Sequence, residues 1–94
     1  MIAYRAGYKQ VKTGIHAQAL DFPGAISWGG NLAEARAALA SALVDVAESL
    51  LADGLPLPVP DPHAVDPEMD VVEPIYFHLA ASSSERETPL AAVA

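Results

Sequence analysis

The side chains that could do chemistry in this sequence are few and widely spaced. The 94 residues include three histidines, His16, His63 and His78, and no cysteine, which excludes disulfides and thiolate zinc sites. His16 and His78 fall in two predicted strands and could approach each other on one face of a sheet. Histidines on strands are more often half-exposed sheet residues than ligands, so the sequence predicts no metal site at this pair.

Carboxylates would support nuclease chemistry only if several of them converged on divalent metal ions, which activate water and stabilise the leaving oxygen. The first predicted strand contains no acid. Asp45 and Glu48 lie three residues apart on one helix face, where a solvated surface is the simpler interpretation. We therefore expect no enzymatic activity and no catalytic residue.

A second acidic group lies in a loop between residues 61 and 70, which could collect a cation. The loop lacks the glycine and the terminal glutamate of a calcium loop, and Pro62 and Pro67 stiffen it. We expect no specific metal and no cofactor at this loop. Its titratable residues are Asp61, His63, Asp66, Glu68 and Asp70.

Charge is distributed unevenly along the chain, whose formal net charge is -7. Arg5, Lys9 and Lys12 lie in the first twenty residues, which contain no acid, whereas eight acids and no lysine or arginine lie between Asp45 and Glu73. An acidic field repels nucleic acid and attracts a basic partner. The alternative is that the acids only keep an alanine-rich chain soluble.

Two places on the sequence are candidates for binding a protein partner. Trp28 ends a predicted strand beside two glycines, where its ring is either the lid of a small core, which we favour, or an anchor for a partner. The apolar arc of the predicted helix is widened by Ala40, Val44, Ala47 and Leu51. Either the proline-rich segment or the tail covers these side chains, or they form an interface with another protein. The candidate partner-binding residues are Trp28, Ala40, Val44, Leu51, Asp45 and Glu48.

One long amphipathic helix, predicted over about residues 31–53, must position most of these side chains. Asn31 and Glu34 have the spacing of a capping box at its start. Gly54 suits a left-handed C-cap, and the prolines after it cannot continue the helix. The apolar stripe expected to face the core contains Leu32, Leu39, Leu43, Val46 and Leu50.

Three short strands are predicted before the helix. Residues 2–8 and 15–20 form a hairpin that turns near Gly14. Asp-Phe-Pro-Gly at residues 21–24 is a strong turn signal, and residues 25–28 make the third strand. The result is a three-stranded antiparallel sheet that leads into the helix.

The composition changes after the helix. Five prolines favour an extended crossing over residues 55–67, and alternation predicts a fourth strand at about residues 74–79. Because a long helical crossover separates the third and fourth strands, we expect the fourth to lie parallel in the same sheet. We expect one domain over residues 1–79 and a flexible tail over residues 80–94.

Size and hydropathy set the remaining expectations. Nineteen alanines and only six aromatic residues leave little apolar bulk for one small core, so we expect a homodimer or higher oligomer. No apolar run approaches the roughly 18 residues of a membrane span, and the N-terminus lacks the apolar core of a signal peptide. We therefore expect a soluble, cytoplasmic protein.

Several of these segments together resemble the HicB antitoxin family over roughly residues 2–60. The resemblance lies in Gly-Ile-His-Ala at residues 14–17, the Asp-Phe-Pro-Gly turn, Ser27, Gly29, the Asn-Leu-Ala-Glu-Ala cap, and the helix exit that ends Gly-Leu-Pro-Leu-Pro at residue 58. The chain departs from the family pattern at Leu20, Ala25 and Asn31. Asparagine is as good a cap as the usual threonine, so the last departure changes nothing.

The resemblance implies an α+β, partial ribonuclease-H-like β-β-β-α-β fold, with the helix across three antiparallel strands and the fourth strand beside the first. It also implies an antitoxin that binds and neutralises HicA, a small basic toxin that cleaves messenger RNA. Many members add a C-terminal DNA-binding module. Only fifteen residues follow the predicted fourth strand here, so we expect a stand-alone domain that does not bind nucleic acid.

An alternative within the same family is an orphan domain without a toxin partner. Such a domain would serve as a homo-oligomeric scaffold or as a sensor of a small molecule. A third possibility, transcriptional repression, would require a basic surface, for which Arg5, Lys9 and Lys12 are the only candidates.

Overall fold

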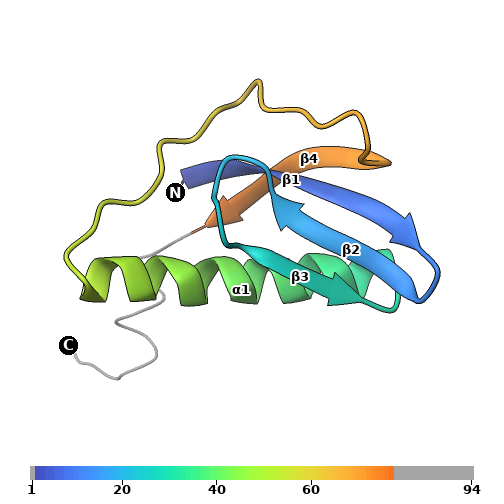
Figure 1. The fold of residues 1–94 in the computed structure, drawn as a ribbon, viewed down its shortest axis with the longest axis horizontal. Helices are drawn as coiled ribbons and strands as arrows, with labels where there is room; N and C mark the ends of the chain where they lie inside the picture. The colour runs from blue at the N-terminus through green and yellow to red at the C-terminus, as the bar shows by residue number, and fades with distance from the viewer. Residues whose placement is uncertain (1, 78–94) are drawn as a thin grey trace.

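The computed structural model describes residues 2–77, which form a four-stranded sheet and one long helix (Figure 1). The sheet order is β3-β2-β1-β4, and all neighbouring strands are antiparallel. This confirms the α+β fold with a helix on one face and the fourth strand beside the first. The elements are β1 Ile2–Val11, β2 Gly14–Ala19, β3 Ile26–Gly29, α1 Leu32–Ala52 and β4 Val71–Phe77.

The direction of β4 corrects the expectation of a parallel fourth strand. Ile2 pairs with Phe77 and Tyr8 with Val71, so β4 runs antiparallel to β1. A strand starting at the C-terminal end of α1 would have run parallel to β3, but residues 53–70 first carry the chain back along the domain (Figure 1). β4 therefore starts beside the N-terminus of α1, where Val71 and Leu32 line the same hollow.

Side-chain and backbone caps fix both ends of α1. The Asn31 Oδ1 accepts a hydrogen bond from the Glu34 N–H at 2.9 Å, and the Glu34 carboxylate accepts from the Gly30 N–H at 2.9 Å. The carboxylate thus reaches the residue before the N-cap, a variation on the capping box. Gly54 has φ +75°, and the Leu55 N–H donates to the Leu50 carbonyl at 2.9 Å, which completes a Schellman motif.

The core lies between α1 and one face of the sheet. Alanine at positions 35 and 47 of the helix is fully buried, whereas Leu32, Val46 and Leu50 of the predicted stripe are only partly buried at its margins. Small side chains let the helix approach the sheet closely, and Tyr4 fills space edge-on to Phe22, with ring centroids 4.8 Å apart. The buried core contains Tyr4, Ala6, Tyr8, Ala17, Ala19, Phe22, Ala25, Ala35, Leu39, Leu43, Ala47, Ile75 and Phe77.

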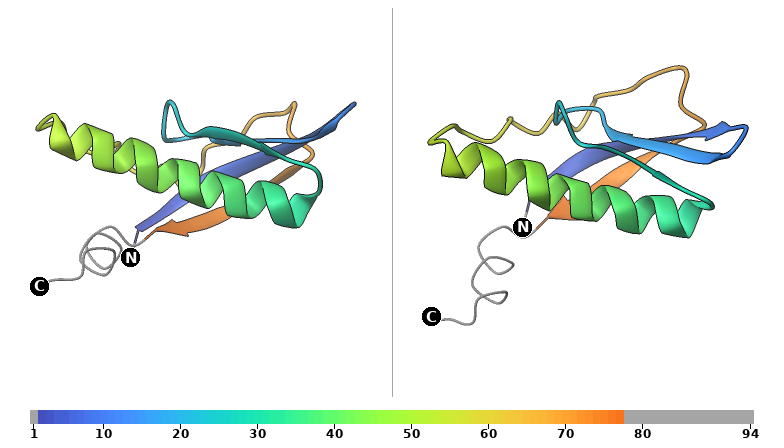
Figure 2. Two further views of the ribbon diagram at one scale, coloured as in Figure 1. Left: turned by 90° about the horizontal axis from the view of Figure 1, so that it is seen from below. Right: turned by 60° about the horizontal axis from the view of Figure 1, so that its bottom comes forward.

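Residues 53–70, the crossing segment, pass over the opposite face of the sheet (Figures 1 and 2). Along β1, Arg5, Gly7 and Lys9 alternate with the core residues and so face away from α1. The Arg5 Nε donates to the Ala64 carbonyl at 3.3 Å, and the Lys9 Nζ to the Glu68 carbonyl at 3.2 Å. The crossing segment thus covers β1 without forming a strand.

Pro74 lies inside β4, where it pairs with Arg5, although we expected the strand to begin there. β4 is the last strand in the sheet order, and a proline is tolerated on such an edge. Positions 78–79 of the predicted strand and the predicted tail lie outside the described residues. Within residues 2–77, no helix has the length and apolar character required to span a membrane.

Candidate functional site

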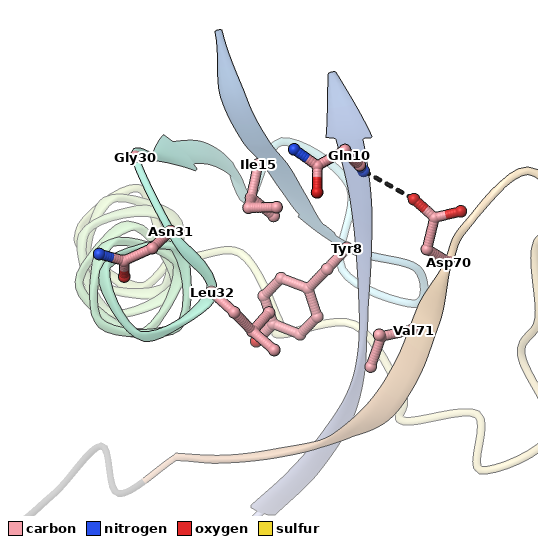
Figure 3. A pocket seen from close by; sticks show the side chains of 8 residues that line it. All are labelled: Tyr8, Gln10, Ile15, Gly30, Asn31, Leu32, Asp70 and Val71. Carbon is pink, nitrogen blue, oxygen red and sulfur yellow. Dashed lines mark hydrogen bonds between the residues drawn. The ribbon is translucent and has the colours of Figure 1, made fainter. Parts of the chain in front are cut away.

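The carboxylates of the acidic loop and of the turn before β3 bind backbone N–H groups. Both oxygens of Asp21 accept, one from the Arg5 N–H at 2.8 Å and the other from the Asp61 N–H at 2.7 Å. Asp70 accepts from the Gln10 N–H at 2.7 Å (Figure 3). These acids therefore fasten the crossing segment to the sheet.

The remaining loop acids act locally. Asp61 and Asp66 each accept from the N–H two residues ahead, at 3.0 and 2.9 Å. Within the part of the chain that the structure describes, no three His, Asp or Glu side chains form a group that could hold a metal ion. The His16 Nε2 lies 2.8 Å from the Gln18 Oε1. His78, the residue suggested to approach His16, is outside the described residues.

Trp28 lies on the sheet face away from α1. It pairs with His16 across β2 and β3, and its side chain is 52 % exposed. The interpretation of Trp28 as a lid on the core is therefore wrong. Its neighbour two residues before, Ile26, is 58 % exposed on the same face and was missed in the sequence.

We define the strand edge as Ile26 and Trp28 with their backbone. The tryptophan ring of this edge packs against β2. The ring lies over Gly14, where a Cβ would come within 2.7 Å of the Trp28 Cζ2. Because only a glycine leaves room there, the ring is supported from below while its other side faces solvent. A supported, half-exposed tryptophan has the properties of an interface anchor.

The helix surface, defined as Ala40, Val44, Glu48 and Leu51, lies on the flank of α1 that leads toward β4. Arg36 begins this row, because it is four residues before Ala40 and pairs with a residue of β4. Ala40 and Leu51 are exposed, and Val44 packs partly against the core. Ala47, which we placed on this flank, is fully buried against the sheet.

The predicted partner-binding residues do not form one surface. Asp45 is turned about 100° around the helix from Val44, toward the other flank. Trp28 lies across the sheet from α1 and belongs to the strand edge. The structure therefore divides the candidates between the helix surface, the strand edge and the exposed Asp45.

A bidentate ion pair fastens α1 to β4 at the start of the helix surface. The Arg36 Nε and Nη2 donate to the two carboxylate oxygens of Glu73 at 2.8 and 2.9 Å. The hydrogen bonds from Arg36 lower the pKa of Glu73. Burial, and next the nearby Glu73 carboxylate, raise the pKa of Tyr8.

We expect Glu73→Gln to lower the melting temperature at pH 7 and to have little effect at pH 3. The pKa of Glu73 is lower in the folded state, so its stabilising effect is present above the unfolded pKa and is lost as the pH falls through the folded one. Thermal unfolding followed by circular dichroism between pH 3 and 7 measures this. Glu68→Gln, which removes an equal charge away from Arg36, should leave the pH dependence unchanged, and an equal effect of both variants would contradict the assignment.

A hollow of about 380 Å³ opens between the N-terminus of α1 and the starts of β2 and β4 (Figure 3). Tyr8 and Leu32 provide apolar walls, and Gln10 and Asp70 bond to each other at its rim. Every buried side-chain nitrogen and oxygen in residues 2–77 has a hydrogen-bond partner, so the hollow contains no buried polar atom that lacks one.

Comparison with known proteins identifies the fold. No protein-family model matches the chain, and no curated protein matches it. A chain in the structure described as the HicA3 and HicB3 toxin-antitoxin complex matches with a TM-score of 0.68 and 22% identity, over 82% of this chain and 99% of that one. The fold is that of the HicB N-terminal domain.

A second structure agrees with this. The N-terminal domain of the antitoxin HicB from Burkholderia pseudomallei matches with a TM-score of 0.68 and 20% identity, over 83% of this chain and 100% of that one. The HicB-type fold implied by the sequence motifs is therefore confirmed, at an identity that speaks for the fold alone.

The motif residues that carried the resemblance are structural in this HicB-type fold. Asp21 fastens the crossing segment, Asn31 caps the helix, and Gly29 lies against the helix backbone, where a Cβ would come within 2.3 Å of the Ala35 nitrogen. They explain why the fold could be identified from sequence, and they leave its interaction surfaces to other residues.

Proposed function

We propose that this domain is an antitoxin that binds and covers a small basic toxin and has no catalytic activity of its own. The observation that carries this proposal is the structural match to a chain in a toxin-antitoxin complex, which covers 99% of that chain. The acidic character of the chain supports a basic partner, since eight acids and no lysine or arginine lie between Asp45 and Glu73. The expected partner is a HicA-like messenger-RNA-cleaving protein in the cytoplasm.

The helix surface is our candidate for the contact. Leu51 is 44 % exposed, Ala40 permits close approach, and Asp45 and Glu48 add negative charge to the outer side of α1. Of the three basic residues that could have supported DNA binding, Arg5 and Lys9 donate to carbonyls of the crossing segment. This engagement favours a protein partner over nucleic acid.

The decisive experiment is co-expression with a HicA-like toxin encoded beside this gene. We expect growth to be restored, the two proteins to co-purify, and the dissociation constant to rise with salt concentration, because attraction between opposite charges is screened. If the adjacent reading frame encodes no small basic protein and none co-purifies, the antitoxin role fails and the orphan scaffold is favoured.

We expect Leu51→Lys to weaken binding of that toxin roughly 30-fold, the effect of losing a central interface residue. Val65→Lys is the matched control, because Val65 is an apolar side chain of the crossing segment that is 73 % exposed and lies away from α1. Isothermal titration calorimetry with purified proteins measures both constants. Equal affinity of the two variants would remove the helix surface from the interface.

A further inference from the structure

The two edges of the sheet are built differently. β4 ends one edge and carries Pro74, which lacks an N–H donor and protects an edge from further pairing. β3 ends the other edge with the sequence Ile-Ser-Trp-Gly, which contains no proline and no charge. An edge strand without such protection is open to pairing with another strand.

Within residues 2–77, the backbone groups of β3 that no neighbouring strand uses belong to its two exposed residues. The Ala19 N–H donates to the Ala25 carbonyl at 3.0 Å, so Ala25 directs its hydrogen-bonding groups toward β2. Hydrogen-bonded and non-bonded pairs alternate along an antiparallel ladder, so Ser27 also points its groups toward β2. The N–H and C=O groups of Ile26 and Trp28 therefore point outward.

These positions are complementary to themselves. If two copies of β3 pair antiparallel about a twofold axis at Ser27, Ile26 of each copy lies opposite Trp28 of the other. The outward groups then form four hydrogen bonds, and each tryptophan ring packs on an isoleucine on the same sheet face. Ser27 meets its own copy with a small side chain.

The pairing would bring the two copies of α1 side by side. Both copies of α1 would lie on the same face of the continuous sheet, near the twofold axis. Arg36 marks the flank of α1 that faces β4, and Ala38 and Ala42 lie on the flank turned away from it. Small side chains therefore line the side on which the second helix would approach.

The lack of charge around β3 favours a second copy of this chain over a basic protein as the partner of this edge. No charged residue occurs between Asp21 and Glu34, a stretch that contains all of β3. A second copy, which also carries a net charge of -7, meets least repulsion at this neutral stretch. A basic toxin would gain no electrostatic attraction there and is drawn to the acidic surfaces.

We infer that the β3 edge is a homodimer interface at which Ile26 and Trp28 of one copy pair with Trp28 and Ile26 of a second copy, giving one continuous eight-stranded sheet. The inference does not depend on the antitoxin role, because it concerns the purified chain alone. The dimer interface does not include the helix surface of either copy.

The test is sedimentation velocity of the purified full chain over a range of concentrations. We expect a reversible dimer that Ile26→Lys weakens at least roughly 30-fold. Tyr76→Lys, at a 60 % exposed aromatic residue on β4, is the matched control and should leave the dimer intact. The sole tryptophan reports independently, since its emission should shift to shorter wavelength as wild-type dimers form.

Two further measurements keep the inference falsifiable. Amide hydrogen exchange should slow at Ile26 and Trp28 on dimerisation, while Ser27 is already protected by β2. Raising the salt concentration should tighten the dimer, because it screens repulsion between two acidic chains, whereas it weakens a complex with a basic toxin. A monomer at all concentrations, an unaffected Ile26→Lys dimer, or fast exchange at both amides in the dimer would overturn the inference.

Discussion

Replacing Gly29 with alanine should reduce the free energy of unfolding by about 3 kcal/mol or more, the upper range for inserting atoms into a packed interior. A Cβ at this position would lie 2.3 Å from the Ala35 nitrogen and 2.7 Å from the Ala35 Cα. Both are backbone atoms of the first turns of α1, which cannot rotate away as a side chain can. The helix would have to leave β3, and with it the buried contacts of Leu39.

Urea denaturation followed by circular dichroism measures this loss. Gly54→Ala is the control, because Gly54 has φ +75° and open space around it, so alanine adds only the strain of a left-handed residue, about 1–2 kcal/mol. A Gly29→Ala protein as stable as Gly54→Ala would show that β3 and α1 are not in backbone contact.

The second large effect is expected at Asp21. Asp21→Ala should cost about 2–4 kcal/mol, because the Arg5 and Asp61 N–H groups lose charge-assisted hydrogen bonds of 2.8 and 2.7 Å. The loss should also release the crossing segment from the sheet. Hydrogen exchange at Asp61 and limited proteolysis within residues 53–70 should both become faster.

Asp66→Ala serves as the control within the crossing segment itself. Within residues 2–77, its carboxylate accepts from the Glu68 N–H alone, two residues ahead, so its removal affects a local turn and should cost about 1 kcal/mol. Asp21→Asn should be intermediate, because an amide retains one accepting oxygen. If the Asp21→Ala and Asp66→Ala proteins were equally stable, the two hydrogen bonds that Asp21 accepts would contribute nothing to the stability of the fold.

Local signals allowed much of the fold to be predicted from the sequence. Asn31 and Gly54 marked the ends of the helix because capping depends only on neighbouring backbone groups. The direction of β4 was missed because the helix suggested a crossover, while the return path through residues 53–70 depends on distant contacts such as Asp21 with Asp61. No spacing rule connects two residues forty positions apart.

The orientation of β3 shows why part of the proposed interaction surface was missed. Trp28 is the largest side chain of the strand, and a large aromatic ring is usually buried. Gly29 must face α1 to permit backbone contact, and alternation then turns Trp28 and Ile26 outward. The signal in the sequence was Gly29. Because it has no side chain, it can face α1, and this places Ile26 and Trp28 on the opposite face.

The burial of residues along α1 also differs from the prediction. The stripe predicted to face the sheet consisted of Leu32, Leu39, Leu43, Val46 and Leu50 and contained no alanine. In the fold, Ala35 and Ala47 are fully buried, while Leu32 and Leu50 are only partly buried. Burial along α1 follows the position of each residue around the helix rather than the size of its side chain.

The position of β1 has a consequence for synthesis on the ribosome. β1 is made before its partner β4, which ends at Phe77, so the pairing of Ile2 is complete only after residue 77 has been made. Proteins dominated by such distant pairings fold slowly, because loop closure precedes the contacts that compensate for it. A nascent chain stopped before residue 71 would expose the unpaired side of β1, and chaperone binding during translation should concentrate in that interval.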